Sequence, residues 1–415
     1  MRDLVILGAG TAGTMVANRL RRRLPRREWR ITVVDHEVAH LYQPGLLFVP
    51  FGGGKAQKLV KPRRRSLDSG VDFVVGDVDR IEPAARLVHL ADGHRLDYDF
   101  LVIASGTQPR PDQTPGMLGD LWRKSIHEFY TYDGAIALRE ALEGFARTGG
   151  RLVVHIVDMP IKCPVAPLEF AFLADAHLRA LGIRDEVEIT YVTPLPDAFT
   201  KPVAAATLGS MLTDRKILLE TDFLVEHIDG EARELVSYDE RRIPFDLLVT
   251  VPLNMGADFV ARSGLGDELN YVPVDRHTLR SKAYDTIFAI GDAADLPTSK
   301  AGSVAHFAAD VFVANFVRLA RGDPMTESFD GHANCFVEAG DDKALLIDFN
   351  YDTEPLPGTY PLPAVGPLRL LRATRLNHWG KLAFAWLYWH VLLPGRPLPL
   401  PAEMSMAGKR RPKEE

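Results

Sequence analysis

The chain has 415 residues, of which 46% are hydrophobic and 25% charged, and its formal net charge is −6 at pH 7. This length predicts two or three domains with a sizeable core, and the composition excludes a disordered or fibrous chain. The negative charge disfavours general nucleic-acid binding, which requires a basic surface, so we expect no nucleic-acid partner. Two cysteines cannot form a disulfide framework, and the first residues do not have the pattern of a secretory signal, so we expect a cytoplasmic protein.

A dinucleotide-binding turn is predicted at the start of the chain. The apolar residues 4–7 are followed at once by three glycines with G-x-G-x-x-G spacing: Gly8, Gly10 and Gly13. The first glycine permits a tight turn, the second lets a pyrophosphate approach the backbone, and the third lets the following helix pack on the strand. A second strand over residues 30–34 leads into Asp35, where an acidic residue can meet ribose hydroxyls. The motif alone does not distinguish FAD from NAD.

Two later apolar segments end in further small-residue turns. Residues 100–106 (FLVIASG) end in Ser105 and Gly106, and residues 286–295 (TIFAIGDAAD) contain Gly291 and Asp292. Between these segments, a helix over 133–148 and strands over 152–157, 186–193 and 247–251 are predicted. This alternation is typical of a βαβ unit, so a second doubly wound domain is expected within residues 114–281.

The turn that follows the strand at 152–157 departs from a nucleotide-binding loop. It contains no glycine, and Pro160 and Pro164 lack the backbone N–H groups that would bind a phosphate. We therefore expect no NAD(P)H binding by the usual loop. Cys163 stands at this corner, and Cys335 follows much later in the chain. A free cysteine is most often a small buried hydrophobe, and this alternative stays open for both.

The C-terminal part is predicted to lie at an interface. Residues 355–367 are rich in proline, which favours an irregular segment on the surface. Residues 368–393 hold three of the five tryptophans between basic flanks, a pattern typical of a helix in the plane of a bilayer surface, although a helix packed on the core is the alternative. The tail over 404–415 is predicted to be disordered. The glycines in 51–55 (FGGGK) lack P-loop spacing and are expected in a surface loop.

The whole chain resembles the sulfide:quinone oxidoreductase and flavocytochrome c sulfide dehydrogenase family of the flavoprotein disulfide reductase superfamily. The resemblance is carried by four motifs: I-K-C-P-V-A-P at 161–167, K-A-G-S-V-A-H-F at 300–307, H-A-N-C-F at 332–336 and N-H-W-G-K-L-A-F at 377–384.

The expected fold class is α/β, with two tandem Rossmann-like dinucleotide-binding domains, the second inserted in the first. The FAD-binding domain would comprise residues 1–113 and 282–330. The second domain would comprise 114–281 and be degenerate for NAD, and a C-terminal quinone and membrane-interface region would comprise 331–415.

The resemblance implies a sulfide:quinone oxidoreductase with FAD as cofactor. Sulfide would be oxidised to sulfane sulfur through a redox disulfide, and electrons would pass through FAD to a membrane quinone. The implied residues fall into three groups. The redox pair is Cys163 and Cys335. Cofactor-binding residues, besides those of the turns above, are Val78, Lys300 and Lys381, with Asp292 at the ribityl chain. The quinone pocket holds Phe307 and Phe336.

The same resemblance implies a peripheral protein on the cytoplasmic side of the cell membrane, attached by its C-terminal helix, with homo-oligomers possible. The sequence departs from the family at Tyr130, which stands where many members carry a third cysteine. Four side chains are candidate proton carriers: His155, Glu169, His306 and His332. No residue cluster has metal-ligand spacing, so no metal is predicted.

Three alternative functions stay open from the sequence. The first is a type II NADH dehydrogenase, which the missing glycine loop disfavours. The second is the flavin subunit of a flavocytochrome c. The third is a flavin-bound scaffold with an inert sulfur site.

Overall fold

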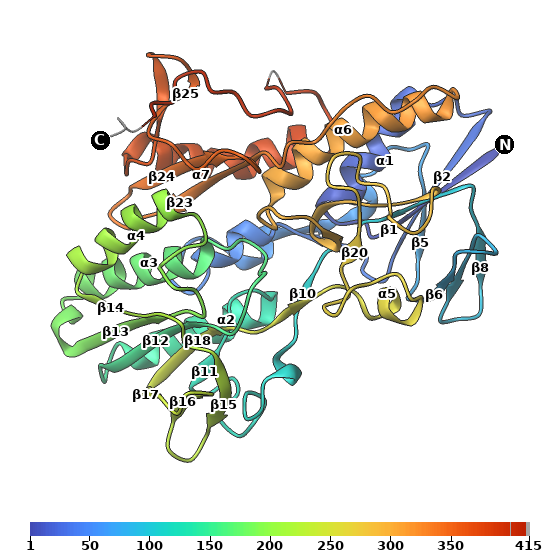
Figure 1. Ribbon diagram of the computed structural model, residues 1–415. Helices are drawn as coiled ribbons and strands as arrows, with labels where there is room; N and C mark the ends of the chain where they lie inside the picture. Colours follow the sequence, from blue (N-terminus) through green and yellow to red (C-terminus); the bar gives the residue numbers. More distant parts are fainter. Residues whose placement is uncertain (399, 412–415) are drawn as a thin grey trace.

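The computed structural model describes residues 1–398 and 400–411 in three parts (Figure 1). Two parts are Rossmann-like units, each built on a parallel five-stranded sheet. The third is a C-terminal sheet with a helix across it. This arrangement confirms the expected α/β fold class with two Rossmann-like units.

The first sheet has the strand order β21-β9-β1-β2-β5, and all its pairs are parallel. Its central strands are continuous apolar runs, as expected for a parallel sheet covered on both faces. The strands are β1 (Arg2–Leu7), β2 (Trp29–Asp35), β5 (Asp72–Val75), β9 (Phe100–Ile103) and β21 (Ile287–Ala289). The carboxyl ends of β1 and β9 therefore meet at one edge, where a dinucleotide binds in such sheets.

Two helices of this unit, α1 (Thr11–Arg23) and α6 (Gly302–Ala320), pack against each other. Helix α6 is long and apolar enough to cross a membrane by length and composition alone, but 61% of its apolar window is buried inside the protein. It is therefore a core helix. A three-stranded antiparallel sheet also belongs to this unit, formed by β6 (Val78–Glu82), β7 (Leu87–Leu90) and β8 (Arg95–Asp97).

The second sheet has the order β11-β18-β12-β13-β14 and is also parallel. Its strands are β11 (Ile126–His127), β12 (Gly150–Ile156), β13 (Val187–Val192), β14 (Ile217–Glu220) and β18 (Leu247–Val251). Its helices are α2 (Tyr132–Phe145), α3 (Ala166–Ala180) and α4 (Pro202–Asp214). A second antiparallel sheet is formed by β15 (Val225–Asp229), β16 (Glu234–Ser237) and β17 (Arg242–Pro244).

Short elements connect the two units. Strand β10 (Gln108–Pro109) pairs with β19 (Asn254–Met255), and β20 (Val272–Pro273) pairs with β22 (Ala294–Asp295). Helix α5 (Asp258–Arg262) contacts β6. The range 114–281, expected for the second domain, thus includes α5 and β20, which lie against the first unit. Strands β3 (Ala39–Leu41) and β4 (Val60–Pro62) form a further antiparallel pair.

The C-terminal part is a four-stranded sheet in the order β23-β24-β26-β25, with helix α7 against it (Figure 1). Its elements are β23 (Ala333–Glu338), β24 (Ala344–Phe349), β25 (Gly358–Leu362), β26 (Gly366–Leu370), α7 (Arg375–Leu387) and the π-helical turn η7 (Tyr388–Leu392). The proline-rich segment, expected to be irregular, instead forms the hairpin β25–β26. Strand β25 lies at the sheet edge, where proline is tolerated because one side of the strand needs no ladder hydrogen bonds.

The expectation of a disordered tail is wrong for residues 404–411. Lys409 and Asp348 form a buried ion pair, with Nζ and Oδ2 2.5 Å apart and both side chains 1% exposed. The backbone of Gly408 also accepts a hydrogen bond from the N–H of Thr359 at 3.0 Å. A tail that buries a charged pair and joins a strand is ordered by these contacts, which charge composition alone does not reveal. Residues 412–415 lie outside the described part of the chain.

Candidate active site

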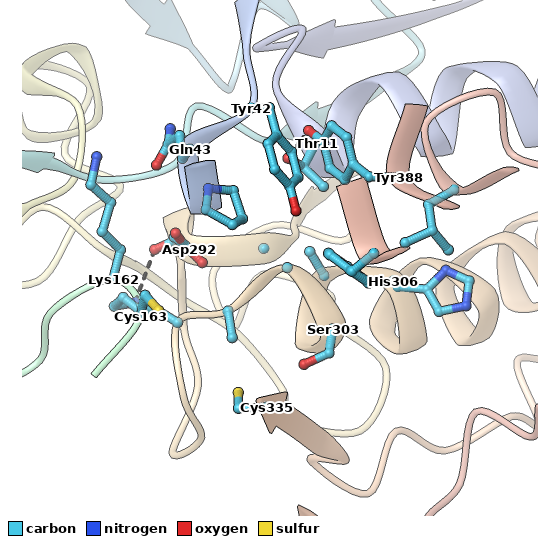
Figure 2. Close-up of a pocket in the computed structure, with 18 of the residues that line it drawn as sticks. Thr11, Tyr42, Gln43, Lys162, Cys163, Asp292, Ser303, His306, Cys335 and Tyr388 are labelled. Atoms are coloured by element: carbon cyan, nitrogen blue, oxygen red, sulfur yellow. Dashed lines mark hydrogen bonds between the residues drawn. The ribbon is translucent and has the colours of Figure 1, made fainter. Parts of the chain in front are cut away.

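One cavity of about 730 Å³ is lined by residues from all three parts of the protein. Figure 2 shows Thr11, Tyr42 and Tyr388 around one region of it, and Cys163, Asp292, Ser303 and Cys335 around another. The cavity therefore brings the dinucleotide turn, both cysteines and the C-terminal helix to a common space.

The glycine turn has the close contacts that its motif predicts. A Cβ on Gly8 would lie 2.4 Å from the carbonyl oxygen of Ala104, and a Cβ on Gly13 would lie 1.9 Å from that of Gly8. Gly8 also has φ +106°, a conformation that favours glycine. The backbone N–H of Ala9 donates a 2.6 Å hydrogen bond to Oδ2 of Asp35, which fixes the loop against the end of β2.

This region fits FAD. A Cβ on Gly10, Gly106 or Gly302 would meet nothing within 4 Å, so the backbone is open to a ligand at three points of the cavity wall. Helices α1 and α6 both begin at this wall without a side-chain cap, and such helix N-termini favour phosphate. The buried hydroxyl of Ser105 has no hydrogen-bond partner among the described residues. Bound FAD would supply a two-electron carrier beside the cysteines.

Most of the predicted cofactor residues line this cavity, but Val78 and Gly13 do not. Val78 lies at the start of β6, and its carbonyl accepts a 3.3 Å hydrogen bond from the exposed Arg262. Gly13 packs against Gly8. Lys300 lines the cavity, yet its ammonium donates to the carbonyls of Asp292 (2.9 Å) and Ala294 (3.2 Å). It also lies 3.6 Å from the ring centroid of Tyr271. Burial lowers the pKa of Lys300 to about 8.

Cys163 and Cys335 line the same cavity as free thiols. Cys163 follows β12 with φ +51°, an uncommon conformation for a residue with a side chain. Its N–H donates a 2.7 Å hydrogen bond to the carbonyl of Lys300, and the neighbouring N–H of Lys162 donates to Oδ1 of Asn254 at 3.2 Å. The protein thus engages two backbone donors of the corner that a pyridine nucleotide would use.

Both thiols are held protonated at neutral pH. Burial raises the pKa of Cys163, with the carboxylate of Glu169 acting in the same direction. Burial and Glu169 likewise raise the pKa of Cys335, to about 12. A nearby cation, Lys381, partly opposes the shift at both sulfurs.

Lys381 of α7 and Glu169 of α3 form an ion pair in this cavity. Glu169 is 1% exposed, and its Oε1 also accepts the N–H of Glu338 at 2.5 Å. Burial would lower the pKa of Lys381, but the carboxylates of Glu169 and Glu338 raise it above its usual value. A protonated amine is therefore fixed beside both thiols.

The predicted acceptor-pocket residues, Phe307 and Phe336, both line the cavity. The ring of Phe307 stacks on His332, with 3.9 Å between centroids and 7° between planes. A Cβ on Gly380 would lie 3.0 Å from the ring of Phe336, so this glycine lets the ring approach α7 closely. Aromatic and aliphatic side chains of α7 continue the wall: Ala383, Phe384, Trp386 and Leu387.

The chain is similar in sequence and fold to several known proteins. The family model "Pyridine nucleotide-disulphide oxidoreductase" matches residues 2–159. The mitochondrial sulfide:quinone oxidoreductase of Dictyostelium discoideum is 26% identical over 95% of this chain and 86% of its own. That of Mus musculus is 24% identical over the same shares. The solved sulfide:quinone oxidoreductase of Aquifex aeolicus superposes with a TM-score of 0.80 at 19% identity, covering 95% of this chain and 92% of its own. Over almost its whole length the chain is therefore similar to the sulfide:quinone oxidoreductase family.

Members of this family are FAD-dependent flavoproteins, and FAD is the cofactor of this chain. The chain is an enzyme, an oxidoreductase. Tyr130, expected at the position of a third cysteine, lines the cavity, and its hydroxyl donates to the carbonyl of Cys163 at 3.3 Å.

The four candidate proton carriers lie in different places. Glu169 and His306 line the cavity, but Nδ1 of His306 is 2.8 Å from the guanidinium of Arg19, and burial lowers its pKa to about 3. His332 lies behind Phe307 and contacts Asp348 at 2.8 Å. His155 is buried in β12, where its ring contacts Thr250 at 3.0 Å and burial lowers its pKa to about 3. Among these side chains, Glu169 lines the cavity and accepts hydrogen bonds from Lys381 and the N–H of Glu338.

Two polar groupings were not predicted from the sequence. The hydroxyl of Tyr388 lies 2.7 Å from Oγ1 of Thr11 and 2.6 Å from Nε2 of His40, which ties the C-terminal segment to the dinucleotide turn. Glu338 and His378 form a second grouping behind Lys381. His378 belongs to the motif at 377–384, which is a signal that could have identified it, whereas the Tyr388 contacts depend on long-range packing.

Proposed function

We propose that this enzyme oxidises sulfide to sulfane sulfur and reduces a membrane quinone. The observation that supports this most is the meeting of Cys163 and Cys335 in one cavity with the dinucleotide turn and α7. The names of the relatives, which describe sulfide as donor and quinone as acceptor, point to the same reaction.

The sulfur steps begin from a Cys163–Cys335 disulfide. Hydrosulfide attacks Sγ of Cys163, the S–S bond breaks, and Cys335 leaves as a thiolate. Cys163 then carries a persulfide. A second hydrosulfide or another thiolate takes the sulfane sulfur and leaves a thiol on Cys163. Loss of two electrons and the thiol proton restores the disulfide.

The protein's own groups support these steps. The ammonium of Lys381 lies beside both sulfurs and opposes the rise in their pKa, so it stabilises the departing thiolate of Cys335. The Tyr130 phenol has no sulfur to exchange, so transfer from Cys163 goes to an external acceptor rather than to a third cysteine.

We further propose that α7 rests on a bilayer surface. Four apolar side chains, spaced three or four residues apart on one face, are exposed: Leu376 (41%), Trp379 (62%), Leu382 (50%) and Trp386 (62%). Tryptophans and leucines on one helical face are typical of interfacial binding. The inner side of α7 lines the cavity, so a quinone could enter from the bilayer past Phe336. Location on the cytoplasmic side and formation of homo-oligomers stay predictions.

A turnover assay tests this function. Purified holoenzyme should form decylubiquinol when given sulfide and decylubiquinone without air. Thiocyanate should accumulate when cyanide is supplied as the sulfane-sulfur acceptor. Turnover with NADH and none with sulfide would favour a type II NADH dehydrogenase instead. The engaged N–H groups of Lys162 and Cys163 argue against that outcome.

A further inference from the structure

A line of titratable side chains leads from the cavity to the surface beside α7. Its inner end is Lys381, which lines the cavity and pairs with Glu169. The middle is Glu338, at the end of β23 and 1% exposed. The outer members are His378, one helical turn before Lys381, and Asp342, in the turn between β23 and β24.

The inner members of this line are neighbours, and the closest carboxylate–imidazole contact joins Glu338 to His378. The backbone N–H of Glu338 donates to Glu169, and the Glu338 carboxylate is close enough to raise the pKa of Lys381. Nδ1 of His378 lies 3.0 Å from both carboxylate oxygens of Glu338. These distances allow a proton to pass between the imidazole and the carboxylate.

The outer end reaches solvent. The side chain of His378 is 14% exposed, and its Nε2 lies 3.9 Å from Oδ1 of Asp342, whose side chain is 80% exposed. A small movement of the exposed Asp342 side chain would close this gap or admit one bridging water. Since His378 has one nitrogen toward buried Glu338 and the other toward exposed Asp342, it can exchange protons with both sides.

The proposed reaction creates a demand for such a route. Oxidation of one hydrosulfide to sulfane sulfur on a second thiolate releases two electrons and one proton. Reduction of a quinone to quinol consumes two electrons and two protons. One proton per turnover must therefore enter the buried cavity from solvent.

We propose that His378 and Glu338 deliver this proton from solvent to Lys381. Lys381 then passes it to the quinone pocket, the part of the cavity lined by Phe307 and Phe336. This inference rests on the proposed function, because the demand for a proton comes from quinone reduction. His378 touches neither sulfur nor the cavity, so it acts through Glu338 and Lys381. Two other histidines near Phe307 are engaged: His306 by Arg19, and His332 by Asp348 and the carbonyl of Ala402.

The test compares His378→Gln with His94→Gln. His94 is a matched control because its Nδ1 also pairs with a carboxylate, that of Asp92 at 2.9 Å, and it lies on an exposed turn that does not line the cavity. Holoenzyme is reduced with one equivalent of dithionite, so that no step depends on sulfide. It is then mixed rapidly with decylubiquinone, or with ferricyanide, which accepts electrons without protons.

We expect His378→Gln to slow flavin reoxidation by decylubiquinone about tenfold, as loss of a proton carrier does. Proton uptake, followed with a pH-indicator dye, should slow equally, and the solvent deuterium isotope effect should increase. Added imidazole should restore the rate. Reoxidation by ferricyanide, the flavin spectrum and the melting temperature should match those of His94→Gln.

Two results would overturn the relay. One is a decylubiquinone rate, isotope effect and proton uptake equal to those of the control. The other is an equal slowing with both acceptors that imidazole does not rescue, since this would indicate a structural role. Failure of sulfide to reduce the wild-type flavin would refute the proposed function separately, because the relay test starts from dithionite.

Discussion

The hydroxyl of Tyr130 donates a hydrogen bond to the backbone carbonyl of Cys163 at 3.3 Å. This hydrogen bond lies at the corner where Cys163 adopts its positive φ. Burial raises the pKa of Tyr130 well above its usual value, so the phenol is neutral at any physiological pH. Its role is to orient the backbone of Cys163.

Tyr130→Phe tests that role. One neutral hydrogen bond contributes about 1 kcal/mol, so sulfide-to-quinone turnover should fall by no more than about fivefold. Steady-state rates with sulfide as the varied substrate measure this. A loss of about a hundredfold or more would show instead that the phenol takes part in proton or sulfur transfer.

The tie between Tyr388 and the dinucleotide turn should control FAD retention. Tyr388→Phe removes its hydrogen bonds to Thr11 and His40 and leaves the buried Nε2 of His40 and the partly buried hydroxyl of Thr11 unpaired, at a cost of about 1–3 kcal/mol. FAD affinity should fall about tenfold, measured by flavin fluorescence during dilution. Tyr238→Phe is the control, since Tyr238 is 71% exposed on the second unit. Equal retention by both variants would contradict the coupling.

The dinucleotide turn and both Rossmann-like sheets follow from local sequence. The spacing of Gly8 and Gly13 after an apolar strand is a local pattern. Backbone sterics alone convert this pattern into a tight turn, so the turn can be predicted from the sequence. The absence of a glycine loop at Cys163 is also a local feature, so it could be predicted in the same way.

Contacts between distant segments could not be predicted from local sequence patterns. The Lys409–Asp348 pair and the Tyr388–His40 contact join residues far apart in the chain. Nothing in charge or periodicity specifies such partners. The prediction of a disordered tail was wrong because burial of Lys409 stabilises the tail. Amino-acid composition does not show which residues will be buried.

The Lys409–Asp348 pair should dominate the stability of the tail. Lys409→Met leaves the buried carboxylate of Asp348 with His332 and the amide of Asn334 but no lysine, and should lower the free energy of unfolding by about 3 kcal/mol. Lys343→Met on the surface should have little effect. Burial alone would raise the pKa of Asp348, but His332 and Lys409 have the larger combined effect, so the pKa of Asp348 lies below its usual value.

The sign of the pH dependence follows from this lowered pKa. The contribution of Asp348 is fully present above its unfolded pKa of about 4 and is lost as pH falls through the folded pKa. The difference between wild type and Lys409→Met in urea unfolding should therefore shrink in acid. A difference that grows as the pH falls would contradict the assignment.

The exposed face of α7 should bind bilayers. Replacing Trp379 and Trp386 together by Gln removes two large apolar side chains from the interface, each worth about 1.5–3 kcal/mol when buried. Cosedimentation with phospholipid vesicles should weaken by at least about a hundredfold. Leu224→Gln, at a 53% exposed site on the second unit, should bind as the wild type does. Unchanged binding of the double variant would exclude α7 as the contact.

The most direct test of the sulfur site is anaerobic rapid mixing of oxidised holoenzyme with sulfide, followed at the visible flavin band. Wild type should bleach with sulfide and not with NADH at equal concentration. Cys163→Ser and Cys335→Ser should each keep FAD but lose this bleaching by at least about a thousandfold, because neither can form the disulfide that sulfide attacks. Bleaching at the wild-type rate in either variant, or by NADH alone in the wild type, would contradict the account.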